Sequence, residues 1–244
     1  MIRSVFASLA VALLVAGLIA APASASVIHS ASGLSSAGIP VTFEAKLTIA
    51  GDVLTVELAN NSSVGSLNPN DVLGSYYFDV VDVGNNRPAL TYSSAFGDVY
   101  VADKDSLDLL LTPTADLMAL VPGDYTWQYK AMDETLIPFL GFGIGTVGNS
   151  TVSPNNFMGN IVDGVDYSIY AGDITTQNLT GKALVKDMAT FTFTGLTGFT
   201  EADISPTFAF GLGTAPDSFL TPEPATALLL ATGALVLLRR KRAR

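Results

Sequence analysis

The sequence predicts an all-β domain, either a β-sandwich or a jelly roll. Apolar and polar residues alternate in several runs, and this period of two is typical of strands with one buried face. Gly, Asn, Asp and Ser separate the runs at short intervals, as expected for tight turns. No long segment between the two ends of the chain has a helical period, so a βαβ arrangement is not expected.

The clearest element is a hairpin near the start of the domain. The run 41–49 alternates without a break, Gly51 and Asp52 can form a tight turn, and 54–58 alternates again. Asn and Ser residues at 60–63 end the hairpin, because their side chains favour turns. The further strand candidates, in chain order, are 76–83, 99–101, 125–130, 139–147, 167–170, 183–185, 189–194 and 207–212.

Four segments fit the strand pattern less well. The glycine-rich run 139–147 is either a bent strand or a loop. Residues 106–120 have the best helical pattern, but Pro113 would interrupt a helix there. Residues 150–160 are expected to form a long loop, and 217–224 an exposed linker.

Composition excludes several classes of protein. The 244 residues are 49% apolar and 14% charged, which is too hydrophobic for a disordered chain. The chain has no cysteine, so disulfides, cysteine-ligated zinc and thiol catalysis are excluded. A net charge of -10 argues against binding to nucleic acid, which rewards a basic surface.

The N-terminus has the three parts of a secretory signal peptide. Arg3 precedes an uncharged apolar run, and Ala23 and Ala25 are the small residues expected before a signal peptidase cleavage site. Cleavage after Ala25 makes Ser26 the first mature residue. The alternative is a permanent N-terminal anchor, which the short apolar run disfavours.

A second apolar segment lies near the C-terminus. Pro222, Glu223 and Pro224 precede the uncharged run 225–238. As a helix this run spans about 21 Å, which is less than the roughly 30 Å of a hydrocarbon core. Bilayer thinning can hold such a short transmembrane helix, and a basic end favours the cytoplasmic side. The basic residues that follow it are Arg239, Arg240, Lys241, Arg242 and Arg244.

This tripeptide, short helix and basic end together resemble a PEP-CTERM sorting signal over residues 221–244. Shorter runs at 51–60, 70–79 and 208–213 are similar to parts of exosortase-dependent surface proteins. The resemblance implies that exosortase, a membrane protease, recognises the tail while it is held transiently in the inner membrane. It also implies release to the surface or matrix of a Gram-negative bacterium that makes exopolysaccharide. The alternative is a plain tail anchor.

Without its two ends the chain is strongly acidic. Residues 26–221 carry six basic and 21 acidic side chains, a net charge of -15. Such a surface stays soluble, repels anionic polymers and attracts cations. We therefore expect a signal peptide at 1–25, an acidic β-domain at 26–216, and a linker with the sorting tail at 217–244.

The sequence predicts a protein that is not an enzyme. His29 is the only histidine, and it lies close to the predicted mature N-terminus, where chains are usually disordered. A Ser-His-Asp triad would have to use it. Two carboxylates suffice for a glycoside hydrolase, but no spacing singles out one pair among the 21 acids.

The densest acidic cluster consists of Asp103, Asp105 and Asp108. It is either a solvated turn or a weak calcium site, because calcium prefers several oxygen ligands but the usual glycine and glutamate of a calcium loop are missing. No other cofactor is expected.

Three aromatic residues, Tyr125, Trp127 and Tyr129, share one face of a predicted strand. We interpret this face as part of the core, since the domain has apolar volume to fill. The alternative is an exposed platform that stacks on sugar rings. The expected function is thus a secreted structural or interaction protein associated with exopolysaccharide, and the alternative is a carbohydrate-binding module.

Overall fold

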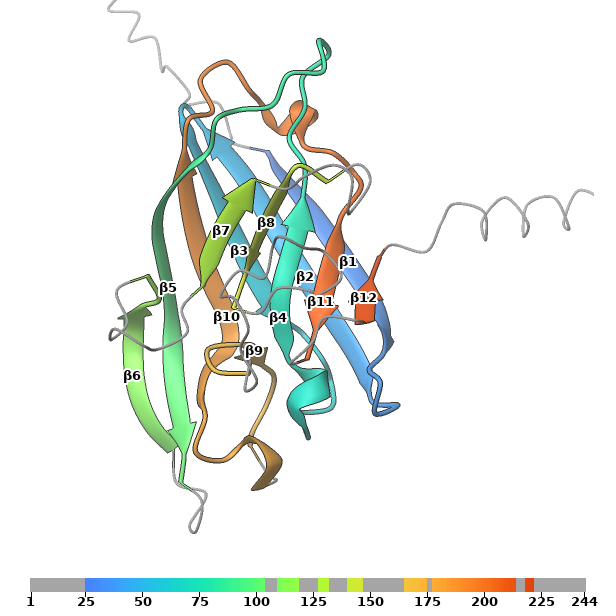
Figure 1. Ribbon diagram of the computed structural model, residues 1–244, viewed down its shortest axis with the longest axis vertical. Coiled ribbons are helices and arrows are strands. Elements are labelled where there is room, and N and C mark those ends of the chain that lie inside the picture. Colours follow the sequence, from blue (N-terminus) through green and yellow to red (C-terminus); the bar gives the residue numbers. More distant parts are fainter. Residues whose placement is uncertain are drawn as a thin grey trace, which may run out of the picture.

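The fold is all-β, as the sequence predicts. A computed structural model describes residues 25–103, 109–118, 127–131, 140–146, 165–174, 177–213 and 218–221 (Figure 1). The strands are β1 (Ser26–Leu34), β2 (Pro40–Ala50), β3 (Val53–Asn60), β4 (Leu73–Phe78), β5 (Thr91–Ala102), β6 (Leu109–Asp116), β7 (Gln128–Ala131), β8 (Phe142–Gly145), β9 (Ile169–Tyr170), β10 (Ala183–Thr194), β11 (Ala209–Leu212) and β12 (Ser218–Leu220). The described helices are the 3-10 turns η1 (Pro69–Asp71), η2 (Gln177–Leu179) and η3 (Glu201–Asp203). None of the helices in this part of the chain has the length and hydropathy to span a bilayer.

The strands form one continuous sheet that folds over into two layers (Figure 1). One layer has the order β1-β2-β3-β10-β5-β6, and every neighbouring pair is antiparallel. The layer in front of it in Figure 1 has the order β7-β8-β4-β11-β12, also antiparallel. Strand β9 joins the layers, because it pairs in parallel with β10 and through Ile169 and Leu73 with β4.

Aromatic side chains fill the space between the layers. The ring centroid of Phe43 in β2 lies 5.9 Å from that of Phe210 in β11. The ring of Phe193 in β10 lies 6.4 Å from Phe78 in β4 and 5.3 Å from Tyr129 in β7. Full burial of a large apolar side chain contributes about 1.5–3 kcal/mol. Because the chain has no cysteine, its stability rests on this core rather than on disulfides.

The predicted hairpin is confirmed. Strands β2 and β3 are antiparallel and are joined by Gly51 and Asp52. Gly51 has a φ of 63°, which suits a glycine in a two-residue hairpin turn. The carboxylate of Asp52 accepts hydrogen bonds from N and Oγ1 of Thr197, at 2.9 and 2.7 Å. These bonds lower the pKa of Asp52 and tie the hairpin to the loop that follows β10.

A partly buried ion pair links the residue after β4 to the loop that leads to β5. Nε and Nη2 of Arg87 each lie 2.8 Å from an oxygen of Asp79, which is 3% exposed. A side chain at Gly141 would collide with both partners, because an added Cβ would lie 2.5 Å from Nε of Arg87 and 2.6 Å from Oδ1 of Asp79. Glycine is therefore required at this position by the close approach of the pair.

Several expected boundaries are wrong. Strand β1 occupies the start that we expected to be disordered, and it pairs with β2 along its whole length. Residues 109–116 form β6 instead of a helix, and Pro113 fits because β6 is an edge strand, where a missing N–H is tolerated. Strand β5 is much longer than the predicted run 99–101. The prediction was too short because serines and a glycine interrupt the alternation of apolar and polar residues in this strand. The two candidates at 183–185 and 189–194 are one strand, β10.

The linker expected at 217–224 is also corrected. Ser218–Leu220 form β12 and pair with β11, so the fold extends four residues beyond the predicted domain end at 216. The long loop expected at 150–160 lies outside the described residues.

Candidate functional site

The two predicted sorting signals lie almost entirely outside the described residues. This holds for Ala23, for Pro222, Glu223 and Pro224, and for the basic cluster from Arg239 to Arg244. Ala25 and Ser26 are described and exposed, and β1 begins at Ser26. At the other end, β12 lies beside β1, where an added Cβ at Gly33 would collide with the side chain of Leu220.

Trp127 belongs to the core, as we interpreted from the sequence, and its burial argues against the alternative of a sugar platform. Its side chain is 1% exposed, and its ring centroid lies 4.8 Å from that of Phe191 in β10. The indole Nε1 donates a hydrogen bond of 2.7 Å to the carbonyl oxygen of Tyr167. Tyr129 is half-buried against Phe193, and burial raises its pKa to about 12. Tyr125 lies outside the described residues.

The acidic cluster remains a prediction. Asp103 is exposed at the end of β5, whereas Asp105 and Asp108 lie outside the described residues. Within the described ranges, no group of three or more His, Asp or Glu side chains is arranged to hold a metal ion.

His29 is a core residue and not part of a disordered terminus. It is 2% exposed, and its ring stacks on Phe208 with a centroid distance of 4.3 Å. Nδ1 lies 2.6 Å from the hydroxyl oxygen of Tyr76 across the interior. Burial lowers the pKa of His29 to about 4, against a smaller opposing effect of the Ser205 backbone. The only imidazole of the chain is therefore neutral at pH 7 and is used in packing.

A concave surface of the described residues lies on the outer face of the first layer, where β5 has irregular neighbours on both sides. On one side, the register between β5 and β10 places residues 186–188 opposite the single residue Asp98. On the other side, the register between β5 and β6 places residues 113–114 opposite the same Asp98. Two β-bulges are therefore aligned at one residue of β5. Bulges redirect side chains and often lie beside functional sites.

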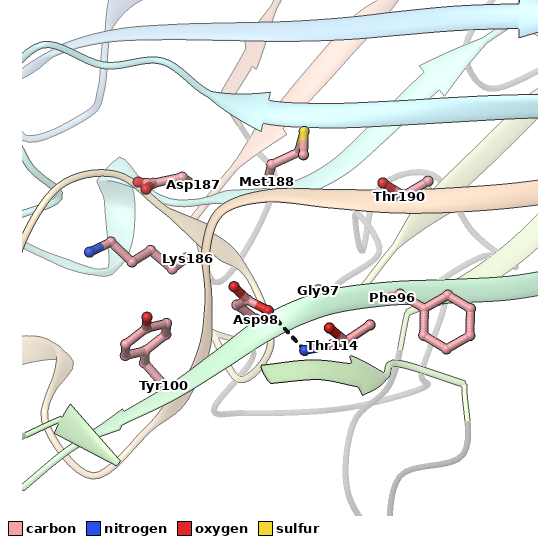
Figure 2. Close-up of a pocket in the computed structure, with 9 residues that line it drawn as sticks. All are labelled: Phe96, Gly97, Asp98, Tyr100, Thr114, Lys186, Asp187, Met188 and Thr190. Carbon is pink, nitrogen blue, oxygen red and sulfur yellow. Dashed lines mark hydrogen bonds between the residues drawn. The ribbon is translucent and has the colours of Figure 1, made fainter. Parts of the chain in front are cut away.

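The bulges open a groove of about 510 Å³, which we call the Asp98 groove (Figure 2). This volume is within the usual range of ligand sites, roughly 300–1,000 Å³. The groove is lined by Phe96, Gly97, Asp98, Tyr100, Thr114, Lys186, Asp187, Met188 and Thr190. Its polar and apolar residues come from three neighbouring strands, β5, β6 and β10.

Two non-glycine residues of the groove have a left-handed backbone. Thr114 has a φ of 49° and Asp187 a φ of 58°. Each is supported by a hydrogen bond: Thr114 N donates to Oδ1 of Asp98 at 2.8 Å, and Oδ1 of Asp187 accepts from Gly172 N at 3.3 Å. Such conformations cost on the order of 1–3 kcal/mol and persist where the surroundings enforce them.

The two ends of the groove differ in chemistry. At one end, Nζ of Lys186 lies 5.4 Å from the ring centroid of Tyr100 and 3.8 Å from Oδ1 of Asp173 (Figure 2). At the other end Phe96 is 40% exposed, and Met188, which lies between the two ends, is 47% exposed (Figure 2). Aromatic, carboxylate and ammonium groups therefore face one surface, which can hold a ligand with both apolar faces and hydroxyl groups.

Sequence reasoning missed this groove. Its signal is the polar interruption at Lys186 and Asp187 between two runs that each alternate, because such a break inside one strand indicates a bulge. Gly97 is a second signal in the sequence, because a glycine inside a strand often marks a bulge or a close approach. In the structure an added Cβ there would lie 2.8 Å from Cγ1 of Val185. The pairing partners that make the bulges meet at Asp98 are set by the tertiary structure.

No protein-family model, curated protein or solved structure matches this chain. The resemblance of its tail to a sorting signal therefore rests on the residues of the tail alone.

Proposed function

We propose that this chain is an exported surface or matrix protein whose folded domain works through non-catalytic contacts. The observation that carries the proposal is the position of the fold within the sequence. The described sheet begins at Ser26 and ends at Leu220, and a predicted sorting signal flanks it on each side. Signal peptidase cleavage after Ala25 would leave β1 intact, and Pro222 follows the last strand residue by two positions.

In this proposal the two ends act only as addresses. The N-terminal segment is a signal helix, and the C-terminal segment is a short transmembrane helix that holds the protein in the inner membrane until exosortase processes it. The mature protein is then a β-sandwich or jelly-roll domain at the cell surface or in the exopolysaccharide matrix. Its net charge of -15 over residues 26–221 favours solubility and bridging by cations, including calcium.

The position of His29 supports a non-catalytic role. Because the only histidine stacks in the core, no imidazole is available to act as a general base at the surface. A glycoside hydrolase that uses two carboxylates is a second candidate, because Asp98 and Asp187 both line the Asp98 groove. That candidate predicts the release of reducing ends from a polysaccharide.

The test is the mass and location of the protein in its native host, with and without Glu223→Ala. We expect the wild-type protein to lose its tail and leave the inner membrane, whereas the Glu223→Ala variant stays there with its tail intact. Glu44→Ala, on strand β2, is the matched control and should be processed normally. Intact tails in both wild type and Glu223→Ala would instead identify a tail-anchored envelope protein.

A further inference from the structure

We propose that the Asp98 groove binds a neutral oligosaccharide. The inference takes its biological setting from the proposed function, because it names the class of matrix component that the domain would contact. The binding itself depends only on the folded domain. The argument has three parts: an exposed apolar surface, carboxylates with unused acceptor atoms, and the charge of the groove.

The apolar part of the groove is formed by Phe96 and Met188, which are 40% and 47% exposed. Phe96 pairs with Thr190 of β10, so a hydroxyl group lies directly across the strands from the ring. Figure 2 shows Phe96 and Thr190 at the same end of the groove, with Met188 nearer its middle. The C–H faces of a sugar ring pack on such an aromatic ring, while its hydroxyl groups reach polar neighbours.

The polar part is formed by Asp98 and Asp187. For each, the hydrogen bond found within the described residues uses Oδ1: Asp98 accepts from Thr114 N and Asp187 accepts from Gly172 N. These bonds fix the carboxylates in position and leave the Oδ2 atoms to accept hydrogen bonds from a ligand. Hydroxyl groups of a sugar are suitable donors, and bonds to charged acceptors are the stronger ones.

The dimensions of the groove fit an elongated ligand. Phe96 and Tyr100 lie four residues apart on β5, a distance of about 13 Å along an extended strand. Asp98 lies midway between them, on the same face. A ligand that contacts Phe96 and the ammonium group of Lys186 above Tyr100 therefore passes both carboxylates (Figure 2).

Charge selects a neutral ligand over an acidic one. The groove carries two carboxylates and one ammonium group, and the ammonium group also lies 3.8 Å from the carboxylate of Asp173. The surrounding domain has a net charge of -15. A uronic acid polymer or a phosphorylated ligand would be repelled by this field, whereas an uncharged polyol is not.

The experiment measures binding of the full-length protein, purified in a detergent without a sugar headgroup. The probes are dextran, a soluble β-glucan, a galactomannan and the exopolysaccharide of the native host, with polygalacturonate as the acidic comparison. Two variants test the groove: Phe96→Ala removes the ring, and Asp98→Asn removes the charge but keeps the oxygen that accepts from Thr114. We expect each variant to weaken binding to whichever neutral glycan the wild type binds by at least about fivefold. This is the effect expected from losing one ring contact or one charged hydrogen-bond acceptor.

Two matched controls lie on other strands of the same layer. Ile28→Ala removes an exposed apolar side chain, 59% exposed on β1, and Glu44→Gln removes a charge on β2. Both should bind like wild type. Emission of Trp127, the only tryptophan, reports whether each variant keeps its core.

Three outcomes would overturn the inference. The first is no binding to any neutral glycan, and the second is binding that Phe96→Ala and Asp98→Asn leave unchanged. The third is release of reducing ends, which would make the groove a hydrolase site. Failure of the proposed function is separate, because the Glu223→Ala experiment measures processing and location rather than sugar binding.

Discussion

Two segments of strand β10 follow different rules, the regular segment Ala189–Thr194 and the bulged segment Lys186–Met188 in the middle of the strand. From Ala189 to Thr194 the strand pairs residue by residue with β3, and every second side chain is buried. From Lys186 to Met188 its pairing with β5 is interrupted, and the side chains are half-buried or exposed. The regular segment fills the core, and the bulged segment presents polar groups to solvent. One strand thus provides both stability and a surface site, from separate sets of residues.

A substitution in the regular segment should have the largest effect on stability. Phe191→Ala removes a fully buried ring that contacts Trp127, and we expect the free energy of unfolding to fall by about 3–5 kcal/mol. Urea unfolding followed by circular dichroism measures this change. Met188→Ala, in the bulged segment of the same strand, is the control and should change stability by about 0.5 kcal/mol or less. Equal effects of the two substitutions would remove the distinction between the two segments.

The next prediction concerns the pH dependence of stability. It depends on His29 in β1, the strand at the edge of the layer that contains β10. The pKa of His29 is about 4 in the folded protein and 6.5 in the unfolded chain, so protons bind the unfolded chain more readily. The stability that neutral His29 contributes is complete above pH 6.5 and is lost as the pH falls from 6.5 towards 4. A shift of this size corresponds to about 3 kcal/mol.

The measurement is the free energy of unfolding between pH 7 and pH 4 for wild type and for His29→Gln, which does not titrate. Lost carboxylate interactions, such as those of Asp52, lower stability in acid in both proteins. We therefore expect the difference between the two proteins to shrink as the pH falls. A difference that stays constant with pH would contradict the assignment of this acid sensitivity to His29.

A smaller effect is expected where the bulge meets β5. In Gly97→Ala the new Cβ would lie 2.8 Å from Cγ1 of Val185 and 3.4 Å from the carbonyl oxygen of Met188. We expect a loss of about 1–3 kcal/mol, because the core residue and the bulge must both shift. Ser94→Ala, on the same strand, is the control with an expected change near zero.

A double-mutant cycle sharpens this prediction. Val185→Ala removes the atom that the new methyl group would contact, so Gly97→Ala should be less destabilising in that background by about 1 kcal/mol. Strict additivity of the two substitutions would show that the close approach at Gly97 does not limit the strand.

The sequence predicted an element well where the alternation of apolar and polar residues in that element is regular. The β2–β3 hairpin was predictable because its alternation, its Gly51–Asp52 turn and its burial all agree. Strand β5 was mostly missed, because Ser93, Ser94 and Gly97 occupy positions where an alternating pattern would have larger residues. Strand β1 was missed because its inner face is made of His29 and Ala31, which are weak hydrophobic signals.

The candidate site was less predictable than the fold. The core interpretation of Trp127 is confirmed, since the ring is buried and its N–H donates to the carbonyl oxygen of Tyr167, so the aromatic pattern of the sequence did not lead to the groove. Among the described residues, the ring that is exposed in the groove is Phe96, in a segment without a recognisable motif. Exposure depends on which strands flank a residue, and local sequence does not contain that information.

The sequence by itself determined the all-β class, the β2–β3 hairpin, the acidic character of the domain and the two terminal signals that we propose as addresses. These features depend on local periodicity, turn residues and composition, which act over a few residues. The tertiary structure decided that His29 packs in the core, that Phe96 is exposed, and that the bulges of β6 and β10 meet at Asp98. Each of these depends on strands far apart in the chain, because long-range pairing and packing select which of two acceptable faces is buried.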